Sequence, residues 1–407
     1  MKTLTIDEQV ELLMQGTEYG DQEMHQAMAD ELRTRLVEAQ KQGRPLKVYC
    51  GFDPVTSDLH LGHTVPMRKL RQFQELGHEV TFVVGNYTSL IGDPSDKDKL
   101  RPQLTQEEVA HNARTYAEQA FKILDRDQTK IVYNATWLSE LSFLELIQLA
   151  SNFTIQQFLT RENFRLRWDK GEPVYLHETF YAIMQGYDAY ALGTDVQVGG
   201  TDQLFNIVTA SRKVMAFKGL PPNVAIIMGI LPGTDGEIKM SKSLGNHIAL
   251  LLEPADMYGK IMSIPDKAMG DYFRLVTALT PPEIEQIEAA LASGQLHPRD
   301  AKMRLGREIV SIYHSSEAAQ EAEAAFVRVF QQGDVPEEMP EYQLQPGETV
   351  LDVLRAGKLV SSNSEGRRML EQNAVSLDGE KLSDPNASFP GPGVLRVGRR
   401  KFLRVKA

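Results

Sequence analysis

Short apolar runs alternate with helix-like segments over the first half of the chain. Apolar runs predict β-strands at 47–51, 80–84, 130–133, 195–198 and 224–228. Between them, a period near 3.6 predicts helices over 63–76, 105–124, 141–150 and 203–217. Such alternation predicts a mostly parallel sheet covered by helices on both faces, with ligands outside the carboxyl ends of the strands.

The pattern changes after about residue 230. Helical spacing returns over 281–291 and 300–314, and a segment rich in Pro and Glu then predicts a linker. Beyond it, two short helices and a hairpin with a turn at Asp378–Gly379 predict a small α+β domain. We therefore expect a sheet domain, a helical domain, a linker and a terminal domain, with the bounds 1–230, 231–332, 333–347 and 348–407.

Charge separates the terminal domain from the rest. The chain has 44 Lys and Arg against 55 Asp and Glu, a net charge of −11. The terminal domain, however, is basic, with a net charge of +4. An acidic chain cannot hold nucleic acid by bulk charge, so any such site must be a local basic patch.

Several classes of protein are excluded by composition. The single cysteine, Cys50, excludes an internal disulfide framework and a cysteine-cluster metal site. No signal-like apolar segment opens the sequence, and its longest apolar run is far too short for a membrane span. We expect a soluble, cytoplasmic protein with no membrane partner.

The first candidate site is a histidine pair at the start of a helix. Leu59-His60-Leu61-Gly62-His63 follows the first strand. A helix N-terminus offers free amides and positive potential, and Gly62 lets a ligand approach the backbone. His60 and His63 could donate hydrogen bonds to phosphate oxygens, which indicates a seat for a nucleoside triphosphate. The alternative is a pair of packing histidines.

A second candidate string is Lys239-Met240-Ser241-Lys242-Ser243, which lies between two turn-rich pieces. Two lysines on such a loop suit a closing clamp on phosphate. The alternative is a solvated surface loop.

These two strings, in this order, resemble the signature motifs of class I aminoacyl-tRNA synthetases. Over nearly the whole chain the sequence resembles the tyrosyl-tRNA synthetase family. The resemblance is carried further by Tyr49–Pro54, Leu90–Ser95, Asn134–Trp137, Tyr181-x-x-x-Gln185-x-x-Asp188 and Gly199–Gln203. It implies a Rossmann-type, doubly wound parallel-sheet catalytic domain, a helical domain and a small α+β RNA-binding domain.

The resemblance also implies the reaction. L-tyrosine is activated with ATP to tyrosyl-adenylate and pyrophosphate, and tyrosine then passes to the terminal ribose of tRNA(Tyr). His60, His63, Lys239 and Lys242 are implied as catalytic groups on the triphosphate, and Gly62 and Asp202 as further ATP contacts. Mg²⁺ is expected to arrive with ATP, and no structural metal is expected.

A tyrosine pocket is predicted around one helix. Tyr181, Gln185 and Asp188 recur at spacings of four and three, so they share a helical face, and polar groups among apolar neighbours demand partners. By resemblance, Asp188 and Tyr49 hold the phenolic hydroxyl, and Tyr181, Gln185 and Asp93 hold the ammonium group. Gln203 joins the tyrosine-binding set, and Trp137 is expected in the core. Val55 and Pro66 depart from the better-known branch, which has Thr at both positions.

The sequence also predicts binding partners and leaves alternative functions open. RNA is expected to bind through Arg367, Arg368, Arg399, Arg400 and Lys401, and the family implies a homodimer; no DNA is expected. Tryptophanyl-tRNA synthetase is the second reading, although its family lacks the basic terminal module. A small-molecule nucleotidyltransferase would share the histidine seat but would not need the 239–243 loop or a basic terminal domain. A non-catalytic RNA-binding protein would typically have lost some of the four His and Lys residues, and all four are present here.

Overall fold

The computed structural model describes residues 4–54, 58–95, 105–328, 339–398 and 401–407. The chain forms two compact units, Met1–Ala319 and Gln320–Ala407.

The first unit is built on a sheet of five parallel strands, in the order β3-β2-β1-β4-β5. Their bounds are β1 Lys47–Phe52, β2 Glu79–Val84, β3 Thr129–Tyr133, β4 Val196–Gly200 and β5 Val224–Met228. The apolar runs predicted these strands to within two residues at each end, which confirms the doubly wound sheet. The order runs outward from β1 in both directions, and this creates a switch point between β1 and β4.

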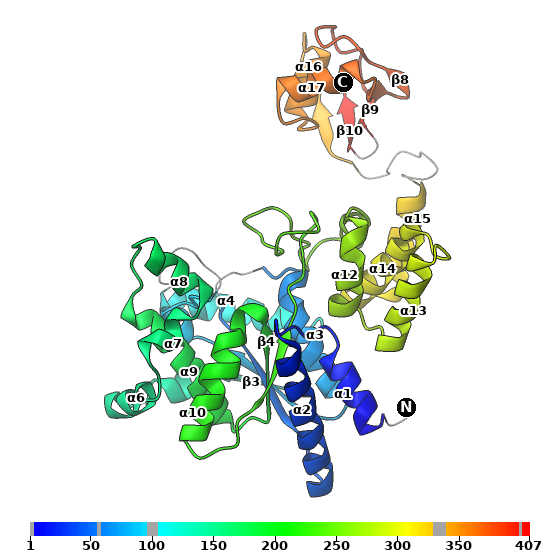
Figure 1. Ribbon diagram of the computed structural model, residues 1–407. Helices are drawn as coiled ribbons and strands as arrows, with labels where there is room; N and C mark the ends of the chain where they lie inside the picture. The colour runs from blue at the N-terminus through cyan, green and yellow to red at the C-terminus, as the bar shows by residue number, and fades with distance from the viewer. Residues whose placement is uncertain (1–3, 55–57, 96–104, 329–338, 399–400) are drawn as a thin grey trace. The chain divides into compact units, whose positions relative to one another are not determined.

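Helices cover both faces of this sheet (Figure 1). Helix α3 (Leu61–Glu75) packs against β1, β2 and β4, and α2 (Gln22–Gln42) packs against β5. Helices α9 (Leu176–Leu192) and α10 (Arg212–Phe217) cover the face toward which Tyr49 and Val83 point. The core is therefore continuous from the sheet into α9, the helix that carries three of the predicted site residues.

The remaining helices of the first unit follow the sheet in two groups. The first group lies around the sheet: α1 Ile6–Met14, α4 Gln106–Ala120, α5 Ala135–Leu138, α6 Phe143–Ala150, α7 Ile155–Leu159 and α8 Glu162–Asp169. The second group is the predicted helical region: α11 Pro254–Met262, α12 Met269–Val276, α13 Pro281–Ala292, α14 Pro298–Tyr313 and the start of α15 Ser316–Val327. Sequence analysis made no prediction over α1 or α2, although apolar residues recur at helical spacing on both helices and are buried there: Val10, Leu13 and Met14 on α1, and Leu32, Leu36 and Ala39 on α2.

One predicted helix differs in type. The helix expected over 203–217 consists of a 3₁₀ turn (Thr201–Gln203), a π-helical stretch (Phe205–Ser211) and α10. A π-helical segment holds its backbone in a wider turn and is frequent at functional sites. The periodicity of the sequence does not distinguish it from an α-helix.

The second unit contains a five-stranded sheet in the order β6-β10-β9-β7-β8, packed with α16 (Val350–Ala356) and α17 (Asn363–Glu371). Its strands are β6 Glu341–Gln343, β7 Val375–Leu377, β8 Glu380–Lys381, β9 Gly393–Val397 and β10 Lys401–Lys406. Asp378 and Gly379 both have positive φ, 48° and 91°, as a two-residue hairpin turn requires. Strand β6 lies within the segment predicted as a linker, where it pairs with β10.

Candidate active site

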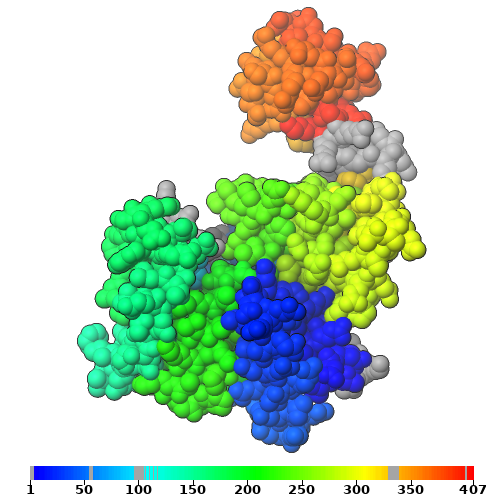
Figure 2. Space-filling view, in the orientation of Figure 1, coloured from blue at the N-terminus to red at the C-terminus, as the bar shows by residue number. Residues whose placement is uncertain are grey.

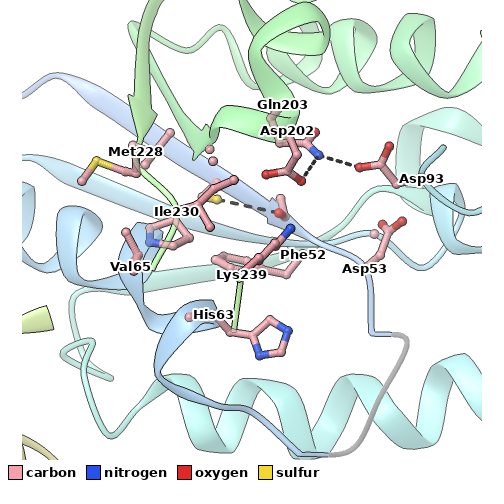
Figure 3. Close-up of a pocket in the computed structure, with 18 of the residues that line it drawn as sticks. Phe52, Asp53, His63, Val65, Asp93, Asp202, Gln203, Met228, Ile230 and Lys239 are labelled. Atoms are coloured by element: carbon pink, nitrogen blue, oxygen red, sulfur yellow. Dashed lines mark hydrogen bonds between the residues drawn. The ribbon is translucent and has the colours of Figure 1, made fainter. Parts of the chain in front are cut away.

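A cavity of about 840 Å³ opens at the carboxyl ends of the parallel strands, at the switch point between β1 and β4 (Figure 3). The ends of four strands, the start of α3, one face of α9 and the segment 238–244 line it. Every residue predicted to bind ATP or tyrosine lies in this lining: Tyr49, His60, Gly62, His63, Asp93, Tyr181, Gln185, Asp188, Asp202, Gln203, Lys239 and Lys242. Residues nearly 200 positions apart are thus brought to one site.

One side of the cavity is organised around Asp188, which is only 4% exposed. Its carboxylate accepts hydrogen bonds from the indole Nε1 of Trp137, at 2.7 Å, and from Nδ2 of Asn134, at 3.2 Å. Burial raises the pKa of Asp188 to about 7, although these two donors oppose the shift. Trp137 packs against the core beside Tyr49, as expected, and its ring nitrogen also serves the buried carboxylate.

Tyr49 lies beside this carboxylate on β1. Its side chain is buried, and its hydroxyl lies 3.4 Å from the backbone oxygen of Gln185. Burial and the nearby Asp188 charge raise the pKa of Tyr49 well above its usual value, so the hydroxyl stays protonated. Oε1 of Gln185 is buried and has no hydrogen-bond partner among the residues that the structure describes. A ligand with a donor group would satisfy it.

Asp53 is a site residue to which sequence analysis assigned no role. Its carboxylate accepts hydrogen bonds from the hydroxyls of Tyr181, at 3.0 Å, and Thr88, at 2.8 Å. A Cβ atom at Gly85, just after β2, would lie 2.0 Å from Asp53 Oδ1, so a side chain there would displace the Asp53 carboxylate. The Gly51–Pro54 string was the available signal, but a partner 128 residues away could not be read from it.

Asp93 and Gln203 form the adjoining wall. Nε2 of Gln203 donates to Asp93 Oδ2, at 2.6 Å, and to Asp202 Oδ2, at 3.0 Å, so it bridges two carboxylates (Figure 3). The backbone N–H of Ser95 donates to Asp93 Oδ1, at 2.8 Å. Burial raises the pKa of Asp93, and the Ser95 hydroxyl acts in the opposite direction.

The two histidines form a close pair of tilted rings at the start of α3. Their ring centroids are 3.8 Å apart, and Nδ1 of His63 accepts a hydrogen bond from the backbone N–H of His60. Burial, with further positive charge from Lys239, lowers the pKa of His60 to about 3 and of His63 to about 4. Both rings are therefore neutral at pH 7, so they are hydrogen-bonding groups that carry no charge.

Backbone hydrogen bonds within the segment 239–243 and just after it hold this segment in place. Within it, the backbone N–H of buried Met240 donates to the oxygen of Leu231. After it, the backbone at 248–250 pairs antiparallel with 59–61, next to His60. Nζ of Lys242 lies 2.7 Å from Oδ2 of Asp58, and Lys239 extends into the cavity (Figure 3). The structure thus brings the two distant motifs to one cavity.

Comparison of the chain with known proteins identifies its family. Residues 40–331 match the model of the tRNA synthetases class I (W and Y), the tryptophan and tyrosine group. The chain belongs to this family of class I aminoacyl-tRNA synthetases. It is 49% identical over 380 residues to a protein of Moorella thermoacetica named tyrosine–tRNA ligase, covering 92% of each chain. A protein of the same name from Desulfotalea psychrophila is 45% identical over 405 residues, 98% of each chain.

Solved structures show the same fold for the synthetase. A C-terminally truncated mitochondrial tyrosyl-tRNA synthetase of Aspergillus nidulans superposes with a TM-score of 0.62 at 23% identity, over 80% of this chain and 94% of the other. A tyrosyl-tRNA synthetase of Archaeoglobus fulgidus, complexed with L-tyrosine, gives 0.60 at 23% identity, over 78% and 100% of the two chains.

The other residues predicted from the sequence are distributed over both units of the synthetase. Arg367 and Arg368 lie on α17, and Lys401 begins β10. Arg399, Arg400 and Val55 lie outside the described residues, and Pro66 lies inside α3, where it lines the cavity. Over the described ranges, no three His, Cys, Asp or Glu side chains gather as metal ligands. No helix among those residues is both long and apolar enough to span a bilayer.

The histidine pair generates a prediction on charge. Neither His60 nor His63 should titrate between pH 5 and 8, because both depressed pKa values lie below that window. Nitrogen-detected NMR of the imidazoles, assigned with His60→Asn and His63→Asn, measures this directly. A midpoint near 6.5 for either ring would contradict the neutral assignment. Lys239→Ala should move the His63 midpoint upward, because it removes a positive charge from the ring's surroundings.

Proposed function

We propose that this synthetase is a tyrosine–tRNA ligase. The observation that carries the proposal is the buried Asp188 carboxylate, held by two neutral donors beside the Tyr49 hydroxyl. A buried acceptor of this kind suits the O–H of a phenol and leaves a phenyl side chain with nothing to offer it. A site that hydrogen-bonds a hydroxyl rejects the analogue lacking it, a rule for which tyrosyl-tRNA synthetases are themselves the established example. The names of the relatives, at 45–49% identity, support the same substrate.

In this proposal the amino acid spans two ends of the cavity. Its phenolic hydroxyl donates to Asp188 and lies near Tyr49. Its ammonium group lies among Asp93, Tyr181, Gln185 and Gln203. Two observations support the second placement: the buried acceptor Oε1 of Gln185 and the carboxylate of Asp93. Asp53 joins this end through its hydrogen bond from Tyr181.

ATP occupies the mouth of the cavity, between the start of α3 and the segment 239–243. His60, His63 and the Gly62 backbone contact the triphosphate from one side, and Lys239 and Lys242 contact it from the other. Asp202 lies where a ribose hydroxyl would donate to it. Mg²⁺ enters with ATP as part of the substrate, bound chiefly by phosphate oxygens.

The chemistry needs no protein nucleophile. The ionised tyrosine carboxylate attacks the α-phosphate in line, the bond to the bridging oxygen breaks, and pyrophosphate leaves. A terminal ribose hydroxyl of tRNA then attacks the carbonyl of the adenylate and expels AMP. Catalysis consists of positioning and of stabilising charge on the phosphates. The lysines supply the charge, and the neutral histidines supply hydrogen bonds.

The proposal assigns a role to each part of the chain. Residues 1–230 bind ATP and tyrosine, 231–332 carry the lysine loop and the helical domain, and 333–347 link these to 348–407. The basic terminal domain binds tRNA through Arg367, Arg368, Arg399, Arg400 and Lys401. Localisation is cytoplasmic, in keeping with a single buried, free cysteine, Cys50.

A homodimer is also proposed, supported by an exposed apolar surface on the first unit. Large apolar side chains are exposed along α6–α9, a segment at the left of Figure 2: Phe143, Leu144, Ile147, Ile155, Trp168 and Leu176. Phe143 is 77% exposed, although it lies on a helix rich in apolar residues. Exposed apolar side chains mark protein–protein contacts where they form a contiguous patch.

Exchange of labelled pyrophosphate into ATP tests the proposed activity. We expect exchange that depends on L-tyrosine, at a rate far above that with L-tryptophan or L-phenylalanine. Exchange supported best by tryptophan would transfer the protein to the other branch of its family. Absence of exchange with any amino acid would refute the activity itself.

Asp188→Ala tests the phenol contact. Loss of one charged acceptor weakens selection of tyrosine over phenylalanine by about ten- to a hundredfold, since such a hydrogen bond contributes roughly 1.5–3 kcal/mol. The ratio of kcat/KM for the two amino acids in pyrophosphate exchange measures it. The KM for ATP serves as the internal control and should stay within about twofold. An unchanged ratio would remove Asp188 from the pocket.

Lys242→Ala tests the proposed contact between the lysine segment 239–243 and the triphosphate. The rate of adenylate formation should fall by about a hundredfold or more, because a charge that stabilises the phosphates in the transition state is lost. Tyrosine binding, which needs no phosphate contact, should barely change. Stopped-flow adenylate formation gives the rate, and equilibrium titration gives the tyrosine Kd. Lys267→Ala is the matched control, because Lys267 is equally exposed and pairs with Glu237 outside the cavity.

A further inference from the structure

Arg161 is a buried cation that no step of the proposed reaction uses. It is the N-cap residue of α8 and is only 7% exposed. Its guanidinium lies over the rings of Phe164 and Phe205, 4.8 and 5.3 Å from their centroids. Burial lowers the pKa of Arg161, which shows that its charge is costly at this position. A buried charge is retained where a nearby anion compensates it.

The compensating anion is Asp93, reached through Ser95. Nη2 of Arg161 donates to Ser95 Oγ, at 2.6 Å, and the backbone N–H of Ser95 donates to Asp93 Oδ1, at 2.8 Å. Attraction between the two charges opposes the effect of burial on both groups: it raises the pKa of Arg161 and lowers that of Asp93. Arg161 is not in the cavity lining, whereas Asp93 is.

The direction of every hydrogen bond around Asp93 is determined. Nε2 of Gln203 faces the carboxylates of Asp93 and Asp202, where an amide oxygen would be repelled. Oε1 of Gln203 therefore points the other way and accepts from Nδ2 of Asn206, at 3.0 Å. The same Asn206 nitrogen donates its second hydrogen to Ser95 Oγ, at 3.1 Å.

Arg161 fixes the last direction in this hydrogen-bond network, because a guanidinium has only donors and no acceptor. Ser95 Oγ accepts from both Asn206 and Arg161, and so its single hydrogen is left to donate. The Ser95 hydroxyl lowers the pKa of Asp93, which is the effect of a donor to the ionised carboxylate. The arginine thus orients the serine, and the serine holds the carboxylate ionised and in place.

We infer that Arg161 is a positioning residue for the ammonium group of the amino-acid substrate. It acts through Ser95 to keep Asp93 ionised. The Ser95 backbone N–H and the Gln203 side-chain amide hold the two carboxylate oxygens of Asp93. The remaining lone pairs of these oxygens are directed to the ligand. The inference rests on the proposed function in one respect, that Asp93 receives the ammonium group of tyrosine.

Ligands that differ only in one charged group test the assignment. Arg161→Met and Arg161→Lys are made in the full chain, and calorimetry measures the Kd of L-tyrosine, of tyramine and of 3-(4-hydroxyphenyl)propionate. Tyramine keeps the ammonium group and lacks the carboxylate, whereas the propionate lacks the ammonium group. Arg161→Met should weaken tyrosine and tyramine by about tenfold or more and leave the propionate within about twofold. Arg161→Lys should recover part of the loss.

The pH profile supplies a second readout. Removal of the cation raises the pKa of Asp93, so Asp93 takes up a proton at higher pH. Tyrosine binding by Arg161→Met should therefore fail at a higher pH than binding by the unaltered protein as the solution is acidified. Arg161→Lys keeps the positive charge, so the pH at which tyrosine binding is lost should stay close to that of the unaltered protein.

Arg167 provides a matched control. It is also buried, at 4% exposure, and lies over the same Phe164 ring, but it pairs with Glu178. Arg167→Lys should lower the melting temperature without changing the ratio of the tyrosine and propionate affinities. Should Arg161→Met fail to fold, Ser95→Ala replaces it, because it removes the link and leaves the cation; the same selective loss is expected.

Two results would overturn the inference: unchanged tyrosine affinity in Arg161→Met, or equal weakening of all three ligands. Failure of the proposed function is distinct, since the unaltered protein would then show no tyrosine-dependent exchange, whatever the variants do.

Discussion

The cost of burying carboxylates governs the design of this site. Asp93 and Asp188 both lie in the cavity wall, and burial raises the pKa of each. The protein compensates them differently. Asp188 has two neutral N–H donors, whereas Asp93 has the Ser95 and Gln203 donors with Arg161 behind them. A carboxylate with neutral donors suits a phenol, and one kept ionised by a cation behind it suits an ammonium group.

The topology of the sheet decides where this can happen. Strand β1 has β2 on one side and β4 on the other, so the loops leaving their carboxyl ends diverge and open a crevice. Gly85 keeps the end of β2 clear for the Asp53 carboxylate. Helix α9 then lies across the Tyr49 face of the sheet and presents Tyr181, Gln185 and Asp188 to the crevice from one side. Rigid elements hold the amino-acid pocket, which is what selection between similar side chains requires.

The nucleotide side is built differently. The lysine segment is a loop, but the backbone pairing of 248–250 with 59–61 ties its base to the residues beside His60. The two motifs are therefore mechanically linked before any ligand binds. The surface ion pair between Lys242 and Asp58 is partly exposed on both sides and contributes little to stability, since such pairs are worth about 0–1 kcal/mol. A triphosphate can displace it at small cost.

Local patterns in the sequence determined most of the elements, and the family resemblance implied most of the residues of the site. Apolar runs located the five parallel strands, the histidine string located the start of α3, and the spacing of Tyr181, Gln185 and Asp188 placed them on one face of a helix. Asp378–Gly379 located the hairpin, because only such residues accept positive φ at two successive positions. These features depend on neighbours a few residues apart, which the sequence displays directly.

Tertiary structure alone decided which of these groups touch and what charge they carry. The pairing of Trp137 with Asp188, of Asp53 with Tyr181 and of Arg161 with Ser95 joins residues 51, 128 and 66 positions apart. The neutrality of the two histidines and the pKa of Asp188 follow from burial. Distance across the chain and loss of solvent are properties of the folded packing, and no local pattern of residues encodes them.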